Sequence, residues 1–496
     1  MTERNQKGSI TVFLSLIMIL LISLFAVSLE SAHMAAVRGQ ISLKSNAVME
    51  DLFSRYERSL YEKYRLLFLN VRQNPERILS DGMKEAGSPE VLKESGVNHL
   101  QFQVEAVELH QTIGLLDSNA EAFQKEVRQI AGGDMVSAFW NKISGNLEKL
   151  EHGQTESGEI NQLLETEQKT EEVQQEGAEA EKTDGQKETD GKQNLSEEEK
   201  ERALSIAALI NTVKKWITDG FFSLIVDNTD ELSGRIVDNR DMPSQDAPKK
   251  KERTGNILEN AVDRSVDAVT MNWYLSQYLD CYTDHRTYDL EYVIGDKRAD
   301  SDNLKTVVNQ LVLLRQVLNL SYLAGDETKK AEAELAAASV LTVLGIPAAA
   351  KVGEYLILTA WAYAEAISDV RILVKGGRVA FLKNSENWKL SLDQAVDFRN
   401  WTEHTGDSKE EGFEYKEYLM LLLFFHSHQR NMYRGLDMIQ WDLMQTDPGF
   451  RVKDCIYGVN AEFRLYVKPV FLSRSAFYDK NGEGVCLEHQ EYYAYE

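Results

Sequence analysis

Residues that commonly carry chemistry are few in this chain and stand far apart. His426 and His428 form the one closely spaced histidine pair. Because they lie two residues apart in a segment predicted as a helix, 415–444, their rings point to different faces and do not converge on a metal ion. The sequence has no glycine-rich phosphate loop, no GxSxG, no HExxH and no CxxC. We therefore expect no catalytic residue, no metal site and no bound cofactor.

The cysteines also argue against a metal or redox centre. There are three, Cys281, Cys455 and Cys486, and so small and odd a set excludes a disulfide-rich domain and a cysteine-rich metal module. Cys455 and Cys486 both belong to the C-terminal part of the chain. We regard these two as candidates for a disulfide across adjacent strands, with Cys281 left as a small buried residue on an apolar helix face.

The charge of the chain excludes some classes of partner. In 496 residues, 79 Asp and Glu against 55 Lys and Arg give a formal net charge of −24. Nucleic-acid binding and docking on anionic lipid both need a basic surface, so neither is expected. Residues 151–201 alone hold 17 of the acids and 5 of the bases, with very few aliphatic side chains. We predict that this segment is an acidic, disordered linker.

Residues 9–29 are uncharged and predict a transmembrane helix. At about 1.5 Å per residue, a helix of this length spans the hydrocarbon core of a bilayer. Arg4 and Lys7 precede it and Glu30 follows it, so the positive-inside rule places residues 1–8 in the cytoplasm. We expect a single-pass protein of the cell membrane whose bulk is extracytoplasmic. A cleaved secretory signal peptide is the alternative.

The helical pattern continues beyond this segment. Residues 31–68 lack proline, and apolar residues recur there at helical spacing. We predict that the transmembrane helix runs on into a long amphipathic helix, which is the shape of a pilin or pseudopilin spine. A membrane anchor followed by a separate first helix is an alternative that the periodicity leaves open.

Two other segments, 99–112 and 455–472, alternate apolar and polar residues with the period of a half-buried strand. We predict that they pair in a small antiparallel sheet, which would join the two ends of the chain. Between them, helical periodicity and alanine-rich segments predict a helical bundle, and Ser196 with Glu199 resembles a capping box at its first helix. The expected fold is therefore mainly α with a small α+β part.

The predicted domains follow from these elements. They are a cytoplasmic leader (1–8), the transmembrane helix (9–29), a membrane-proximal long helix with a strand–helix unit (30–150), the linker (151–201), the helical bundle (202–375) and a C-terminal helix and strand region (376–496).

Several short motifs occur in an order that resembles a known family. They are KGSITVF (7–13) with LESA (29–32), GLLD (114–117) with EAF (121–123), KGGRV (375–379) with Trp388, and RGLDMIQ (434–440). This order resembles an uncharacterised membrane-protein family of Gram-positive bacteria. Its members are typically encoded with tight-adherence (Tad/Flp) pilus genes.

The resemblance implies a TadE-like, pseudopilin-like envelope component. In prepilins a peptidase cuts after the glycine that ends a basic leader, which would be Gly8 here and would leave Ser9 as the first residue. Prepilins commonly carry Glu five residues into the mature chain, where this chain has Phe13. The implied partners are the membrane, pilin-like or pilus-assembly proteins, and further copies bound through the N-terminal helix.

The leading hypothesis is thus a non-enzymatic, anchored envelope protein linked to Tad-type pilus assembly. Two other functions stay open. An anchored binding or sensing module would need a ligand-sized, partly apolar pocket in the helical bundle. An extracytoplasmic hydrolase would need titratable groups that converge in a cleft.

Overall fold

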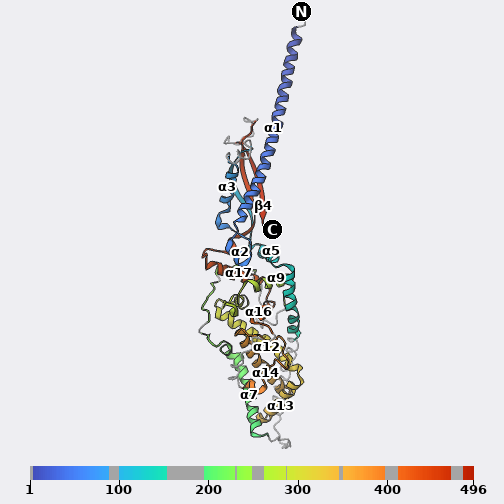
Figure 1. The fold of residues 1–496 in the computed structure, drawn as a ribbon, viewed down its shortest axis with the longest axis vertical. Helices are drawn as coiled ribbons and strands as arrows, with labels where there is room; N and C mark the ends of the chain where they lie inside the picture. Colours follow the sequence, from blue (N-terminus) through green and yellow to red (C-terminus); the bar gives the residue numbers. More distant parts are fainter. Residues whose placement is uncertain are drawn as a thin grey trace, which may run out of the picture. The chain divides into compact units, whose positions relative to one another are not determined.

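The chain is mostly helical, with a small antiparallel sheet of four strands, as the sequence predicts (Figure 1). It divides into two compact units. Unit 1 contains Met1–Glu126 and Asp442–Glu496, and unit 2 contains Val127–Trp441. The computed structural model describes residues 4–88, 100–152, 195–229, 232–238, 240–248, 262–285, 287–345, 350–396, 412–470 and 484–495.

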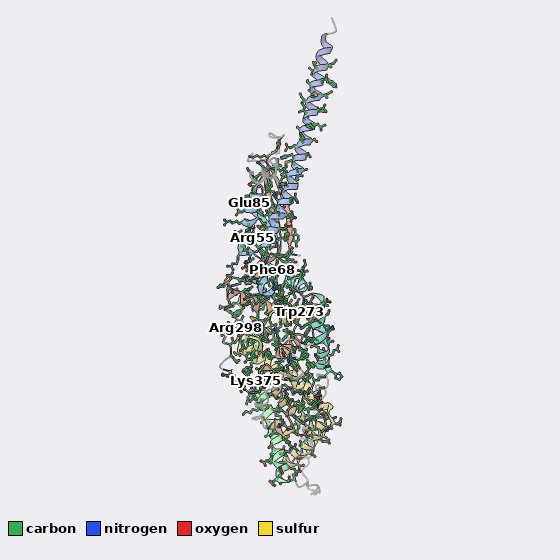
Figure 2. The ribbon with its side chains drawn as sticks, viewed as in Figure 1. Arg55, Phe68, Glu85, Trp273, Arg298 and Lys375 are labelled. Atoms are coloured by element: carbon green, nitrogen blue, oxygen red, sulfur yellow. The ribbon has the colours of Figure 1, made fainter. Side chains whose placement is uncertain are left out.

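Helix α1 runs unbroken from Arg4 to Ser54, over 51 residues. Among the described residues it is the one helix long and apolar enough to cross a membrane. From Ile10 to Leu29 its side chains project from the ribbon with no other described element beside them (Figure 2). The predicted continuation of the helix beyond the apolar segment is therefore confirmed as far as Ser54.

The prediction of helix up to residue 68 is wrong beyond Ser54. The chain turns at 55–57, where the Glu57 backbone N–H donates to the carbonyl of Phe68 at 2.8 Å. This bond closes a loop around the short helix α2 (Arg58–Tyr64). The turn lets Leu60 and Phe68, both fully buried, enter the core of unit 1, which a straight helix would not allow.

The second half of α1 packs on the sheet of unit 1. Its inward residues join the inner face of strand β3 (Cys455–Val467) and helix α3 (Pro75–Ala86) in one hydrophobic core. The main contributors from α1 are Val37, Ile41, Met49, Leu52 and Phe53, each at most 1% exposed. One helix therefore carries the apolar segment at one end and part of a folded core at the other.

Strand β3 is the centre of the sheet. It pairs antiparallel with β2 (Phe102–Gly114), from Phe102 opposite Val467 to Gly114 opposite Ile456. This confirms the predicted pairing of 99–112 with 455–472. Two further strands also pair with β3, namely β1 (Leu69–Asn70) and β4 (Val485–Ala494).

The sequence did not predict β4, because its inward face is not apolar throughout. Register places His489 opposite Phe463 and Glu491 opposite Ala461, both on the core side. The Glu491 carboxylate lies 3.0 Å from His489 Nε2 and accepts a hydrogen bond from Ser45 of α1. These contacts satisfy polar groups that interrupt the alternation.

The disulfide predicted between Cys455 and Cys486 is wrong. Register places Cys486 opposite Tyr466, whereas Cys455 lies at the start of β3 opposite Asn70. At about 3.3 Å per strand residue the two thiols are tens of ångströms apart, and a disulfide needs Cα atoms within about 7 Å. Burial raises the pKa of the Cys455 thiol well above its ordinary range.

Unit 2 is built of helices. After a helix at 133–152, the longer ones are α7 (Glu197–Asp219), α9 (Val266–Tyr278), α12 (Asp300–Gly325), α13 (Glu327–Leu344) and α14 (Ala350–Val374). The shorter ones are α8 (Phe222–Ile225), α10 (Tyr282–His285), α11 (Asp289–Gly295), α15 (Leu392–Val396) and α16 (Tyr415–Leu423). The predicted capping box opens α7, with Ser196 and Glu199 bonded reciprocally. Most of the acidic linker predicted at 151–201 lies outside the described residues.

The single helix predicted at 415–444 is in fact two. Helix α16 ends at Leu423 and α17 (His428–Met444) follows. A distant segment fills the break, because Asp263 donates its backbone N–H to the carbonyl of Phe424 at 2.9 Å, and its carboxylate accepts from the His428 backbone at 3.3 Å. His426 therefore lies in the turn between the helices, and His428 begins α17.

Candidate functional site

The residues predicted for the membrane flank and for processing lie in α1. Arg4, Lys7, Gly8 and Ser9 all fall in its first turns, and their side chains lie outside the described part of the structure. Phe13, at the position where prepilins commonly carry Glu, is 63% exposed. Cleavage after Gly8 stays a prediction.

Glu30, the predicted flank on the other side, is buried. Its carboxylate accepts a hydrogen bond from the Val470 backbone N–H at 3.1 Å and lies 3.2 Å from His33 Nδ1. The residue that ends the apolar run therefore also fastens the chain beyond β3 to α1. This contact gives Glu30 a role in the fold that the sequence did not suggest.

Four charged side chains form a buried charge cluster inside unit 2. Arg315 of α12 contacts Asp369 of α14 at 2.9 Å, and Lys383 contacts both Asp369 at 2.8 Å and Glu365 at 2.7 Å. All four side chains are at most 1% exposed. Two positive and two negative charges balance one another, which a buried group of ions requires.

The environment separates the two carboxylates of this cluster. Burial raises the pKa of Glu365, although Lys383 opposes the shift. Burial acts the same way on Asp369, but Lys383 and Arg315 outweigh it and hold the pKa of Asp369 below its ordinary value. Such a pair resembles an acid and a base in an active site, but all four side chains of the cluster are closed to solvent in this structure.

The cluster instead fastens the segment after α14 to the helices. Arg315 also donates to the carbonyls of Ala380 and Phe381 at 3.0 and 2.7 Å. Glu365 accepts from the backbone N–H groups of Lys389 and Leu390 at 3.1 and 2.9 Å. Residues 380–390 are therefore held by charge-assisted hydrogen bonds.

The RGLDMIQ motif is a packing face of α17. Buried Asp437 accepts hydrogen bonds from the Ser244 backbone at 2.8 Å and from the Tyr292 hydroxyl at 2.9 Å. Gln440, one turn further on, donates to the carbonyl of Asp241 at 2.9 Å. Burial raises the pKa of Asp437 to about 6. This motif joins three parts of unit 2 that are far apart in the sequence.

Gly435 of the same motif packs closely against the buried side chain of Leu275. A Cβ atom there would lie 2.3 Å from Leu275 Cδ2 of α9. We expect Gly435→Ala to destabilise unit 2 by about 1–3 kcal/mol through overpacking. Gly145→Ala is the matched control, because Gly145 is also inside a helix but has open space around it; it should stabilise by about 0.5–1 kcal/mol. Urea denaturation measures both, and equal effects would contradict the packing role.

The KGGRV motif ends α14. Gly376 adopts φ +83°, the left-handed conformation that favours glycine at a helix C-terminus, and the Gly377 N–H donates to the carbonyl of Ile372 at 2.9 Å. This tight turn leaves Lys375 exposed beside Asp227, at 2.8 Å. The motif thereby forms one edge of a surface cavity.

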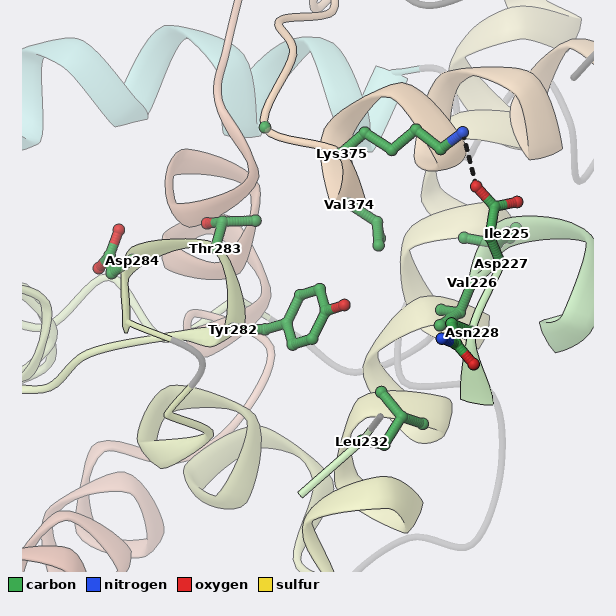
Figure 3. Close-up of a pocket in the computed structure, with 11 residues that line it drawn as sticks. Ile225, Val226, Asp227, Asn228, Leu232, Tyr282, Thr283, Asp284, Val374 and Lys375 are labelled. Carbon is green, nitrogen blue, oxygen red and sulfur yellow. Dashed lines mark ion pairs between the residues drawn. The ribbon is translucent and has the colours of Figure 1, made fainter. Parts of the chain in front are cut away.

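That cavity has a volume of about 470 Å³, within the usual range for small-molecule pockets. It lies between the chain after α8, the short helix α10 and the end of α14, all in unit 2 (Figure 3). Ile225, Val226 and Val374 are almost fully buried and give it an apolar floor. Asn228 and Tyr282 add polar groups.

Each charged side chain that lines the cavity has a partner. Asp227 contacts Lys375 and Arg371, and the bond from Lys375 holds the pKa of Asp227 below its ordinary value. Asp284 pairs with Lys416 at 2.8 Å. The walls of the cavity therefore carry paired charges.

Glu291 of α11 binds the backbone of a residue that lines the cavity. It is fully buried and accepts a hydrogen bond from the Tyr282 backbone N–H at 2.9 Å. Burial raises the pKa of Glu291 to about 8. Because Tyr282 begins α10, this bond holds one wall of the cavity in place.

The sequence did not identify the cavity or the buried charge cluster. The sequence does contain one indication of the cluster. Arg315 interrupts the apolar stretch of α12, and Glu365 and Asp369 interrupt that of α14. A charge in an apolar helix predicts a buried partner. The partners themselves come from other elements, and spacing in the sequence does not reveal them.

No curated protein and no solved structure matches the chain. The model of a family described as "Family of unknown function (DUF5702)" matches residues 196–466, which is more than half of the chain. The matched range contains the KGGRV and RGLDMIQ motifs, the cavity and the buried charge cluster. The chain therefore belongs to the DUF5702 family of unknown function.

Proposed function

We propose that the chain is a non-enzymatic, membrane-anchored component of the cell envelope, of pseudopilin type, that acts in Tad-type pilus assembly or adhesion. The observation that carries the proposal is the continuity of α1. Its first half exposes large apolar side chains, such as Phe13 and Phe25 at 63% and 66%, and its second half belongs to the core of unit 1.

An exposed apolar helix is unfavourable in water, at about 25 cal/mol for each Å². A bilayer or neighbouring helices of the same kind would cover it. Because no break separates the two halves, unit 1 continues directly from the anchor, which supports a spine rather than a flexible tether. The basic residues Arg4 and Lys7 support a cytoplasmic N-terminus and an extracytoplasmic bulk.

The proposed partners follow from the same helix. Copies that share a membrane and an orientation would meet along α1, as would pilin-like or pilus-assembly proteins. The order of the motifs resembles that of a family whose members are typically encoded with Tad genes, and this resemblance supports the proposal. The proposed role in pilus assembly or adhesion requires no catalytic step in either unit.

The mature N-terminus tests the anchor and its processing. We expect the chain from the membrane fraction to begin at Ser9, as sequencing or intact-mass measurement would show. A start at Met1 would keep the anchor but contradict processing. A start near Leu29 would contradict the anchor. Deleting the gene should lower surface pili and adherent cells at least several-fold, and unchanged counts would reject the assembly role.

The cavity in unit 2 favours a second function, an anchored extracytoplasmic binding module. Its size, its apolar floor and its few polar groups are those of a small-molecule site. The two functions are compatible, since the anchor belongs to unit 1 and the cavity to unit 2.

A further inference from the structure

The polar groups of the cavity that lack partners can both donate and accept hydrogen bonds. In the described part of the chain, neither the Tyr282 hydroxyl nor the Asn228 amide has a hydrogen-bond partner. Figure 3 shows the Tyr282 ring between α10 and the segment of Val226 and Asn228, with its hydroxyl toward that segment. The Thr283 hydroxyl also lines the cavity; it has one hydrogen-bond partner, the Cys281 sulfur at 3.4 Å, and can make a second hydrogen bond.

The charges around the cavity disfavour an ionic ligand. A carboxylate ligand would share Lys375 with Asp227, which lies 2.8 Å from the ammonium and repels a second anion, and an ammonium ligand would share Asp284 with Lys416, which lies 2.8 Å away and repels a second cation. In each pair the neighbouring opposite charge therefore offsets part of the attraction that a charged ligand would gain. A neutral ligand leaves them intact.

The floor of the cavity suits a flat apolar surface. Val226 and Val374 offer methyl groups, and the Tyr282 ring stands beside them. A ligand that fits has an apolar face for this floor and hydroxyl groups on its edge for Asn228, Tyr282 and Thr283. Hydroxyl groups match these residues because both sides donate and accept.

From this arrangement we propose that the cavity binds a neutral, polyhydroxylated ring, the chemistry of an uncharged sugar. The proposal rests on the second function above and names its ligand class. The sugar is a free monosaccharide or a unit of a glycan, and both present the same ring.

Ligand-observed NMR on the full chain tests the proposal, in a detergent without a sugar headgroup. The probes are glucose and N-acetylglucosamine, their β-1,4-linked tetramers, and the charged analogues glucuronate and glucosamine. We expect a neutral sugar to bind with Kd below about 10 mM and both charged analogues to bind at least about fivefold more weakly. Tighter binding of a tetramer than of its monomer identifies a glycan, and equal binding identifies the free sugar.

Two variants locate the binding. Tyr282→Phe keeps the ring and removes the hydroxyl, and Asn228→Ala removes an exposed amide without disturbing the core; each should weaken binding about five- to tenfold. Tyr278→Phe is the matched control, because Tyr278 of α9 does not line the cavity, and it should leave Kd unchanged.

Three results would overturn the proposal: no neutral sugar binds, a charged analogue binds as tightly, or Tyr278→Phe weakens binding as much as Tyr282→Phe. Tight binding of a charged analogue would keep the binding function and reject only the ligand class. Membrane fractionation reports separately on the anchor, so its outcome does not affect this test.

Discussion

Replacing Asp369 by alanine is expected to lower the free energy of unfolding of unit 2 by about 3–5 kcal/mol. Asp369 balances Arg315 and Lys383, which are both closed to solvent. Without it, two buried cations face the single carboxylate of Glu365. An uncompensated buried charge is costly because the protein interior solvates it poorly, so the loss exceeds that of an ordinary hydrogen bond.

Tryptophan fluorescence during urea denaturation measures this effect in the full chain. All 7 tryptophans lie between residues 140 and 441, and unit 2 spans Val127–Trp441, so the signal reports on unit 2.

Asp238→Ala is the matched control. Arg240 holds the pKa of Asp238 at about 2 through a side-chain hydrogen bond, but both side chains are in water and the pair is screened. We expect the control to unfold like the wild type. An Asp369→Ala variant that also did so would show that the cluster contributes nothing to stability.

Replacing Glu291 by glutamine is expected to remove a large dependence of stability on pH. Burial raises the pKa of Glu291 in the folded chain to about 8, from an ordinary value of 4.5. Between these values the folded state holds a proton that the unfolded state has released, so stability falls as pH rises. The loss is on the order of 4 kcal/mol between pH 4 and pH 9.

Glutamine has the shape of the protonated acid and keeps an oxygen for the Tyr282 N–H. The difference in unfolding free energy between Glu291→Gln and the wild type should therefore be small near pH 4 and largest near pH 9, where the variant is the more stable. Urea denaturation at a series of pH values measures it, again by tryptophan fluorescence. Other titrating groups cancel in the difference.

Glu198→Gln serves as the control, because Glu198 is exposed in the first turn of α7. It should leave the pH dependence as in the wild type. If the unfolding free energies of Glu291→Gln and the wild type changed in parallel with pH, Glu291 would be ionised in the folded chain, contrary to its burial.

The accuracy of the sequence analysis differed between elements for physical reasons. Strand β3 was predicted because its inward residues are apolar at every second position, so burial and sequence coincide. Strand β4 was missed because His489 and Glu491 point inward and are satisfied by neighbours. The break after Leu423 was missed because Asp263, far away in the sequence, makes the bonds that replace the helical ones.

By itself the sequence determined the class of structure: a long apolar N-terminal helix, a helical middle and strands that join the ends. These helices and strands depend on the periodicity and length of apolar segments, which can be seen in each segment alone. Only the tertiary structure revealed the buried charge cluster and the cavity. The cluster of Arg315 and Asp369 joins residues 54 positions apart, and the cavity joins three separate segments. Charge balance and cavity walls depend on neighbours in space, which spacing along the chain does not specify.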